Sequence, residues 1–194
     1  MAATPPWAAG LDVTMLFEKV KKRHHLPRLE EATIAVCFAD NKPFVKGRFN
    51  WGKVRRFNPL DKLFQGDKFD FLVVLCATAW QGILKEDSKK EALVDLHLSR
   101  CSVEYVPETR TEEKHGVEKH IVIKDDWGRI EYTDEIKRDE EGNPKWRVLP
   151  LDLHVFAENA TRYGVWCEEL LNFKEALGEP TVIAAADNVE HSDA

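Results

Sequence analysis

The chain has 194 residues, of which 43% are hydrophobic and 32% are charged, and its formal net charge is −6. These proportions are ordinary for a globular protein and provide for one hydrophobic core. The acidic balance argues against non-specific nucleic-acid binding, which depends on neutralising phosphates. No apolar run approaches the ~20 residues that a transmembrane helix needs, so we expect no membrane contact.

The first half of the chain predicts helices and a small sheet after a flexible segment at 1–10. Apolar residues at helical spacing predict a helix that Pro27 ends. Runs rich in β-branched and aromatic residues predict strands, and one of them is apolar throughout, as in a strand buried on both faces. The predicted elements are, in chain order, a helix at 11–25, strands at 32–40, 44–58 and 70–78, a helical turn at 80–84 and a helix at 86–100. Asp87 or Ser88 is expected to cap the last helix, because Glu91 follows Ser88 at capping-box spacing.

The composition changes at 102–148, which is strongly charged. Strand-like apolar residues flank the sequence DDWG, where Gly128 suits a positive φ, so a hairpin is predicted. We expect this segment to be an insertion that projects from the core. The remaining predictions are helices at 151–163 and 166–177, one α+β domain at 11–178 and a disordered tail at 179–194.

The cysteines stand singly, without a CxxC pair, at positions 37, 76, 101 and 167. Isolated cysteines of this kind are typical of buried thiols in a cytoplasmic protein. The N-terminus has no basic segment followed by an apolar core, so no signal peptide is predicted.

One pair of residues has the spacing of a metal chelate. His97 and Cys101 are four residues apart on the predicted 86–100 helix and its end, so they share a helical face. A hydrolytic zinc needs about three such ligands and an open position for water. His154, on a second predicted helix beyond the insertion, is a further candidate. The alternative is that these residues are packing residues.

Four stretches of the chain together carry a family pattern. They are HHLPRLEEATIAVCF, FDFLVVLCATAWQGI, KKEALVDLHLSRC and WGRIEYTDEIKRDEEGNPKWRVLPLDLHVFAENATRYGVW. With them the chain resembles the phage metallopeptidases, a family of small zincin-like proteins of phages and prophages, from about Leu16 to Leu177. The resemblance implies an α+β, zincin-like fold in which a small sheet packs on helices.

The departures from the family pattern fall on its zinc-binding helix, which normally reads ALxDHELCHC or similar. Aligned without a gap, Leu96 stands at the first zinc histidine, His97 at the general-base glutamate and Arg100 at the second zinc histidine. In the predicted helix at 151–163, Leu151 stands where the family commonly has a histidine. His154 stands where the family tends to have acidic residues. Leucine has no lone pair and arginine adds a cation, so the resemblance implies that zinc and its activated water are lost.

The sequence therefore favours a catalytically inactive protein without a cofactor that acts by binding proteins. The phage context implied by the resemblance places it in the host cell cytoplasm. Its partner would be a host or phage protein complex, for instance a defence system that it inhibits. Aromatic and arginine side chains contribute most to interfaces, and the candidates are Trp51, Arg55, Arg56, Trp127 and Trp146. For the tryptophans, burial under the hairpin is the alternative.

Two other functions stay open on sequence grounds. One is a metal-dependent hydrolase with a relocated site, in which His97, His154 and Asp152 hold zinc or act as acid and base. The other is nucleic-acid binding by the segment 46–57, where basic residues interleave with aromatic ones, as on a stacking surface. Its residues are Lys46, Arg48, Lys53, Arg55 and Arg56 with Phe49, Trp51 and Phe57.

Overall fold

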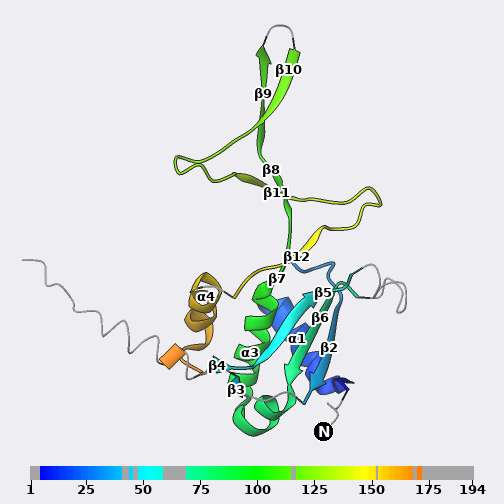
Figure 1. The fold of residues 1–194 in the computed structure, drawn as a ribbon, viewed down its shortest axis with the longest axis vertical. Coiled ribbons are helices and arrows are strands. Elements are labelled where there is room, and N and C mark those ends of the chain that lie inside the picture. The colour runs from blue at the N-terminus through cyan, green and yellow to red at the C-terminus, as the bar shows by residue number, and fades with distance from the viewer. Residues whose placement is uncertain are drawn as a thin grey trace, which may run out of the picture.

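The central sheet has four strands, in the order β1 (Trp7–Ala8), β2 (Ile34–Ala39), β6 (Phe71–Cys76) and β5 (Gly52–Arg56) (Figure 1). In this computed structural model the described residues are 5–40, 44–45, 48–58, 69–114, 117–151, 153–167 and 170–171. Strands β2 and β6 are parallel, whereas β1 and β5 are antiparallel to their neighbours. Strand β6 is apolar along its length and buried at all but one position, as predicted for a strand between two others.

Two predictions for the N-terminal half need correction. Residues 1–10 were expected to be flexible, but Trp7–Ala8 form strand β1, because the Trp7 ring packs on Phe38 with ring centroids 6.1 Å apart. The predicted strand at 44–58 is divided into a short hairpin of β3 (Phe44–Val45) with β4 (Arg48–Phe49), followed by β5. Only β5 joins the central sheet.

Helix α3 (Asp87–Arg100) is the central helix of the core. It packs against α1 (Leu11–His24), α4 (Leu153–Tyr163) and strand β5. Eight consecutive residues, 92–99, are buried, so the helix is covered on all sides rather than along one stripe. A π-helical turn, η1 (Ala79–Ile83), joins β6 to this helix.

The capping prediction for α3 is wrong. The N-cap residue is Glu86, and no side chain caps the helix. Glu91 instead pairs with α1, where Lys19 and Arg23 donate hydrogen bonds to its two carboxylate oxygens. The carboxylate therefore ties two helices together instead of completing a cap.

Residues 101–148 form nested antiparallel pairs that extend away from the helices and the sheet (Figure 1). From base to tip the pairs are β7 (Cys101–Val103) with β12 (Trp146–Val148), β8 (Tyr105–Pro107) with β11 (Tyr132–Ile136) and β9 (Thr109–Lys114) with β10 (Val117–Val122). Two short turns leave this ladder between β10 and β11 and between β11 and β12. The sequence predicted a single hairpin around DDWG and missed β9, which contains no alternating apolar residues.

The base of the ladder is attached to the core by arginines. Arg138 donates hydrogen bonds to both carboxylate oxygens of Glu31, at 2.5 and 3.1 Å. Arg56 of β5 donates a hydrogen bond to the carbonyl oxygen of Trp146. Within the described residues, no helix is both long and apolar enough to cross a membrane. The predicted helix at 166–177 lies largely outside the described residues, and the tail at 179–194 lies entirely outside them.

Candidate functional site

The positions of α3 that would correspond to a zinc-binding motif are used for packing. Leu96 is 2% exposed and belongs to the hydrophobic core. Arg100 is half-buried and donates a hydrogen bond from Nε to the carbonyl oxygen of Leu149 at 3.3 Å. Burial lowers the pKa of its guanidinium. These two side chains therefore present a hydrocarbon surface and a cation where a metal ion would need two lone pairs.

His97 faces strand β5 from within the core. A Cβ atom at position 52 would lie 3.1 Å from Nε2 of His97 and 2.3 Å from the carbonyl oxygen of Val74. Gly52 also has a φ of +140°, so only glycine fits between this strand and the imidazole. Among the described residues, neither ring nitrogen has a hydrogen-bond partner of good geometry.

The surroundings of His97 keep its imidazole neutral. Burial, with a smaller contribution from the charge of Arg100, lowers its pKa to about 4, against an opposing effect of the Trp51 backbone. At neutral pH this residue therefore carries no charge. Its side chain is 2% exposed, so it has no access to a water molecule in bulk solvent.

Cys101 does not form a chelate with the His97 ring. Its thiol is buried and donates a hydrogen bond to the carbonyl oxygen of His97, with Sγ 3.6 Å from that oxygen. Burial raises the pKa of the thiol to about 12. Because the thiolate is the form that binds metals, this cysteine is protonated and inert at neutral pH.

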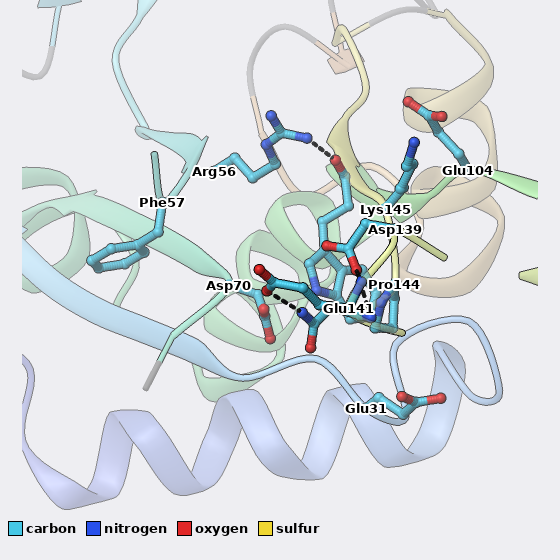
Figure 2. Close-up of a pocket in the computed structure, with 11 residues that line it drawn as sticks. Glu31, Arg56, Phe57, Asp70, Glu104, Asp139, Glu141, Pro144 and Lys145 are labelled. Carbon is cyan, nitrogen blue, oxygen red and sulfur yellow. Dashed lines mark hydrogen bonds between the residues drawn. The ribbon is translucent and has the colours of Figure 1, made fainter. Parts of the chain in front are cut away.

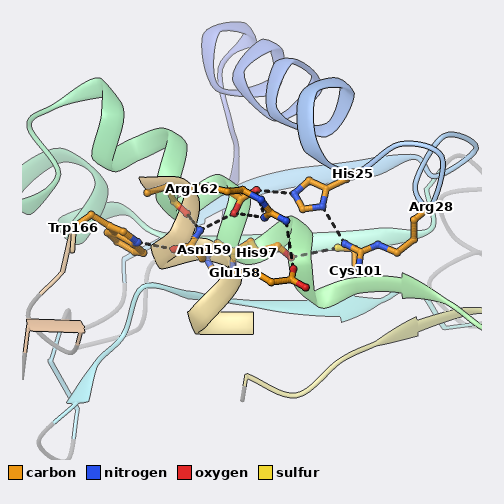
Figure 3. Close-up of polar contacts among 10 residues, drawn as sticks. His25, Arg28, His97, Cys101, Glu158, Asn159, Arg162 and Trp166 are labelled. Atoms are coloured by element: carbon orange, nitrogen blue, oxygen red, sulfur yellow. Dashed lines mark hydrogen bonds and ion pairs between the residues drawn. The ribbon is translucent and has the colours of Figure 1, made fainter. Parts of the chain in front are cut away.

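A buried polar cluster lies on another face of α3, centred on Asp95. We define the Asp95 cluster as His25, Arg28, Asp95, Asn159 and Arg162, of which His25, Asn159 and Arg162 can be followed in Figure 3. Asp95 is fully buried and accepts hydrogen bonds from His25 Nε2 at 2.9 Å, Asn159 Nδ2 at 2.8 Å and Arg162 Nη1 at 2.9 Å. One carboxylate thus links the end of α1 to α3 and α4.

The hydrogen bonds of the cluster fix the tautomer of His25. An arginine can only donate, so Nδ1 of His25 accepts from Arg28 Nη2 at 3.0 Å and Nε2 must carry the proton that Asp95 accepts. Burial lowers the pKa of His25. Burial acts to raise the pKa of Asp95, but the hydrogen bonds of His25 and Asn159 and the charge of Arg162 outweigh it and lower that pKa.

The Asp95 cluster therefore holds helices together and has no free proton acceptor for chemistry, since both nitrogens of His25 are occupied. No sequence pattern predicted this cluster. A signal was present in ALVDLHL, where a lone aspartate stands in an apolar run and requires buried partners.

The relocated site could be traced only in part. Asp152 lies outside the described residues, and the side chain of His154 is likewise not described. Among the described residues, no group of three or more histidine, cysteine, aspartate or glutamate side chains is placed to hold a metal ion. The pairing of His97 with His154 stays a prediction.

Exposure separates the candidate contact residues. Trp127 is 80% exposed, in agreement with the prediction. Trp51 and Trp146 are buried at 9% and 7% exposure, so for these two the alternative of burial applies. The Trp51 ring packs on Trp166 and the Trp146 ring on Phe71, each with ring centroids 5.6 Å apart. Both rings belong to the hydrophobic core.

The basic segment 46–57 offers less stacking surface than its sequence suggests. Lys53 and Arg56 are exposed, whereas Trp51 and Phe57 are buried. The half-buried Arg55 lies over the Phe57 ring at 5.4 Å from its centroid. Lys46 lies outside the described residues, as do the side chains of Arg48 and Phe49. The described part of this segment therefore has cations but no exposed ring for a base.

An open cleft of about 560 Å³ separates the base of the insertion from the core (Figure 2). It is lined by the carboxylates of Glu31, Asp70, Asp139 and Glu141 and by Arg56. Three of these carboxylates already have structural partners: Glu31 pairs with Arg138, Asp70 accepts from Thr33, and Asp139 accepts from backbone N–H groups. These three carboxylates therefore stabilise the fold and are not available as catalytic acids.

Comparison with known proteins identifies the family. The family model described as "putative phage metallopeptidase" matches residues 7–175. This match covers most of the chain, so the protein belongs to that family, as its sequence resemblance predicted. No curated protein and no solved structure is found to match it.

The metal that the family name implies does not fit the described motif residues. Leu96 offers only methyl groups, the guanidinium of Arg100 is positive, and His97 points its ring at Gly52 inside the core. The nearby Asp95 is already saturated by His25, Asn159 and Arg162 and would have to give up those bonds to bind an ion.

Proposed function

We propose that this protein is a zincin-like domain that has lost peptidase catalysis and acts by binding a protein partner in the host cell cytoplasm. The proposal is supported by the structural roles of the α3 residues at the motif positions. At the three motif positions, Leu96 and His97 are packed into the core and Arg100 binds the Leu149 carbonyl oxygen.

The loss of catalysis follows from what zinc hydrolysis requires. The metal lowers the pKa of its bound water to about 7, and a carboxylate accepts the water's proton. Leu96 supplies no ligand, and Arg100 would repel the ion. His97, at the position of the general base, is buried and neutral with a pKa of about 4, so it is a weak base without access to a water molecule.

The proposal of partner binding is supported by the insertion. A two-stranded ribbon such as β9–β10 is marginally stable in water, yet here it extends far from the core (Figure 1). Residues 102–148 contain 13 acidic and 9 basic residues, a net charge of −4, which is most of the chain's −6. Such a surface favours a basic protein partner, and the family context makes a host complex, such as a defence system, the partner that we propose.

The experiment removes the insertion and keeps the buried residues at its base, Val103 and Trp146. Val103 and Trp146 form the last pair at the base, so Asn-Gly can replace 104–145 as a two-residue hairpin turn. We expect this variant to keep the helical circular dichroism of the core and to lose the partner that full-length protein retains from host lysate. Neither protein should cleave a peptide library. Zinc-dependent cleavage by the full-length protein that EDTA abolishes would refute the proposed loss of catalysis.

A further inference from the structure

The insertion contains one turn built twice. In the first, Asp125 Oδ1 accepts from the backbone N–H groups of Trp127 and Arg129 at 2.9 and 2.8 Å. In the second, Asp139 Oδ1 accepts from Glu141 and Asn143 at 3.0 and 2.9 Å. The backbone bonds correspond as well, and Gly128 and Gly142 have φ angles of 77° and 84°. The two turns are therefore the same structure at 125–129 and 139–143.

The second turn is an internal control for the first. Glu141 occupies the place of Trp127 and makes the same backbone contact, so the turn does not need an aromatic ring. Trp127 is nevertheless 80% exposed. Arg129 holds the ring in place, because its guanidinium lies 4.9 Å from the ring centroid while its Nε donates to Asp125 at 2.7 Å. An exposed tryptophan that the local fold does not require, fixed by an arginine, is suited to an intermolecular contact.

Other exposed apolar side chains lie on the strand segments that meet at the base of this turn. Lys124 pairs with Ile130, and the Glu131 N–H donates to the Ile123 carbonyl oxygen, which brings the end of β10 beside the start of β11. We define the Trp127 patch as Trp127 with the exposed Ile130 at 41% and Tyr132 at 53%, which stand two residues apart and so lie on one face of their segment. Ile121 and Val122 are also partly exposed on β10, but as successive strand residues they point to opposite faces.

Charge indicates the kind of partner. Residues 121–134 contain four acidic residues, Asp125, Asp126, Glu131 and Asp134, and two basic ones, Lys124 and Arg129, a net charge of −2. The insertion as a whole carries −4. Negative charge repels phosphates of nucleic acids and anionic lipids, and it repels a second copy of the same patch. Positive charge around an apolar pocket would complement it.

We propose that the Trp127 patch is the docking surface for a protein partner that has an apolar pocket rimmed by lysine and arginine. This inference rests on the proposed function, because it names the surface through which that function acts. The Trp127 ring fills the pocket, and the carboxylates around it pair with the basic rim.

The test compares the two turns. A photo-crosslinking amino acid, benzoylphenylalanine, replaces Trp127 in one variant and Glu141 in a matched control, each expressed in full length in the bacterial host. A protein crosslinked at 127 but not at 141 is purified and titrated with wild-type protein, Trp127→Ala and Glu141→Ala at low and high salt. We expect Trp127→Ala to weaken binding at least about 30-fold, which is about 2 kcal/mol, and Glu141→Ala to change it less than about 3-fold. Added salt should weaken the wild-type complex.

Each of the following results would contradict the proposed docking surface. A purified partner that binds Trp127→Ala as tightly as wild type places the surface elsewhere and leaves the proposed function standing. Crosslinks at 127 to nucleic acid or to a second copy of the chain overturn the stated chemistry. Thermal unfolding of Trp127→Ala well below wild type would show that the ring is structural. If no protein binds the wild-type chain at all, the proposed function fails as well.

Discussion

Acidification should destabilise the protein through His97, the imidazole buried between α3 and β5. The folded-state pKa is about 4, whereas the ordinary value is 6.5. Between these two values the unfolded chain binds a proton that the folded chain does not. The stabilising contribution of the neutral imidazole is therefore complete above the unfolded pKa and is lost as the pH falls towards the folded pKa. At about pH 5 this proton binding lowers the free energy of unfolding by about 2 kcal/mol, and near pH 4 it lowers it by about 3 kcal/mol.

The variant His97→Leu removes this proton and keeps a side chain of similar size in an apolar site. We expect its free energy of unfolding to lie within about 1 kcal/mol of wild type near neutral pH, since an imidazole buried without hydrogen bonds is already costly. At about pH 5 the free energy of unfolding of His97→Leu, relative to wild type, should be about 2 kcal/mol higher than it is near neutral pH. His25 and Asp95 also titrate, but they are present in both proteins and cancel in the difference.

Urea unfolding followed by tryptophan fluorescence at several pH values gives both free energies, and the exposed His120→Gln serves as the control. Parallel wild-type and His97→Leu curves between neutral and acidic pH would show that the imidazole takes up its proton at the same pH in the folded and unfolded chain. Burial would then not lower its pKa, contrary to the expectation.

Other predictions concern the cluster and the strand that faces His97. Arg162→Ala leaves Asp95 buried with His25 and Asn159 but with no cation in contact with its carboxylate. It should lower the free energy of unfolding by about 2 kcal/mol in urea titrations. An unchanged urea midpoint would contradict the stabilising role assigned to Arg162. Gly52→Ala should cost at least about 2 kcal/mol, because its Cβ would collide with the backbone at positive φ. Gly82→Ala, where a Cβ meets nothing within 4 Å, should change stability by less than about 0.5 kcal/mol, and equal effects at the two glycines would argue against the clash.

Local sequence pattern predicted much of the core. The continuous apolar run of β6 predicted a buried strand, because burial of its side chains decides the element. The spacing of apolar residues predicted α1 as a helix, but its buried face is Val13, Phe17 and Val20, while Leu11 and Met15 are exposed. Strand β9 could not be predicted, since its sequence TRTEEK has no apolar alternation and its strand form depends on pairing with β10. Likewise, Trp51 and Trp146 are buried by partners distant in the chain, which a local pattern does not identify.

Part of the candidate site could likewise be predicted from the sequence. The altered motif on α3 could be identified from its residues, because side-chain chemistry alone excludes leucine and arginine as zinc ligands. The Asp95 cluster depends on three helices meeting, so no local pattern identifies His25 as the partner of Asp95. The duplication of the turns at 125–129 and 139–143 was visible as D-x-x-G in the sequence, but only the shared hydrogen bonds show that they are one structure.

Zinc content distinguishes a protein that has lost its metal site from a hydrolase whose site has moved. Wild-type protein, His97→Ala and His154→Ala are each incubated with excess zinc, desalted and measured by elemental analysis, with circular dichroism to verify folding. We expect no stoichiometric zinc in any of the three. About one zinc per chain in the wild type, lost in either folded variant, would contradict this expectation and restore a metal-dependent hydrolase with a relocated site.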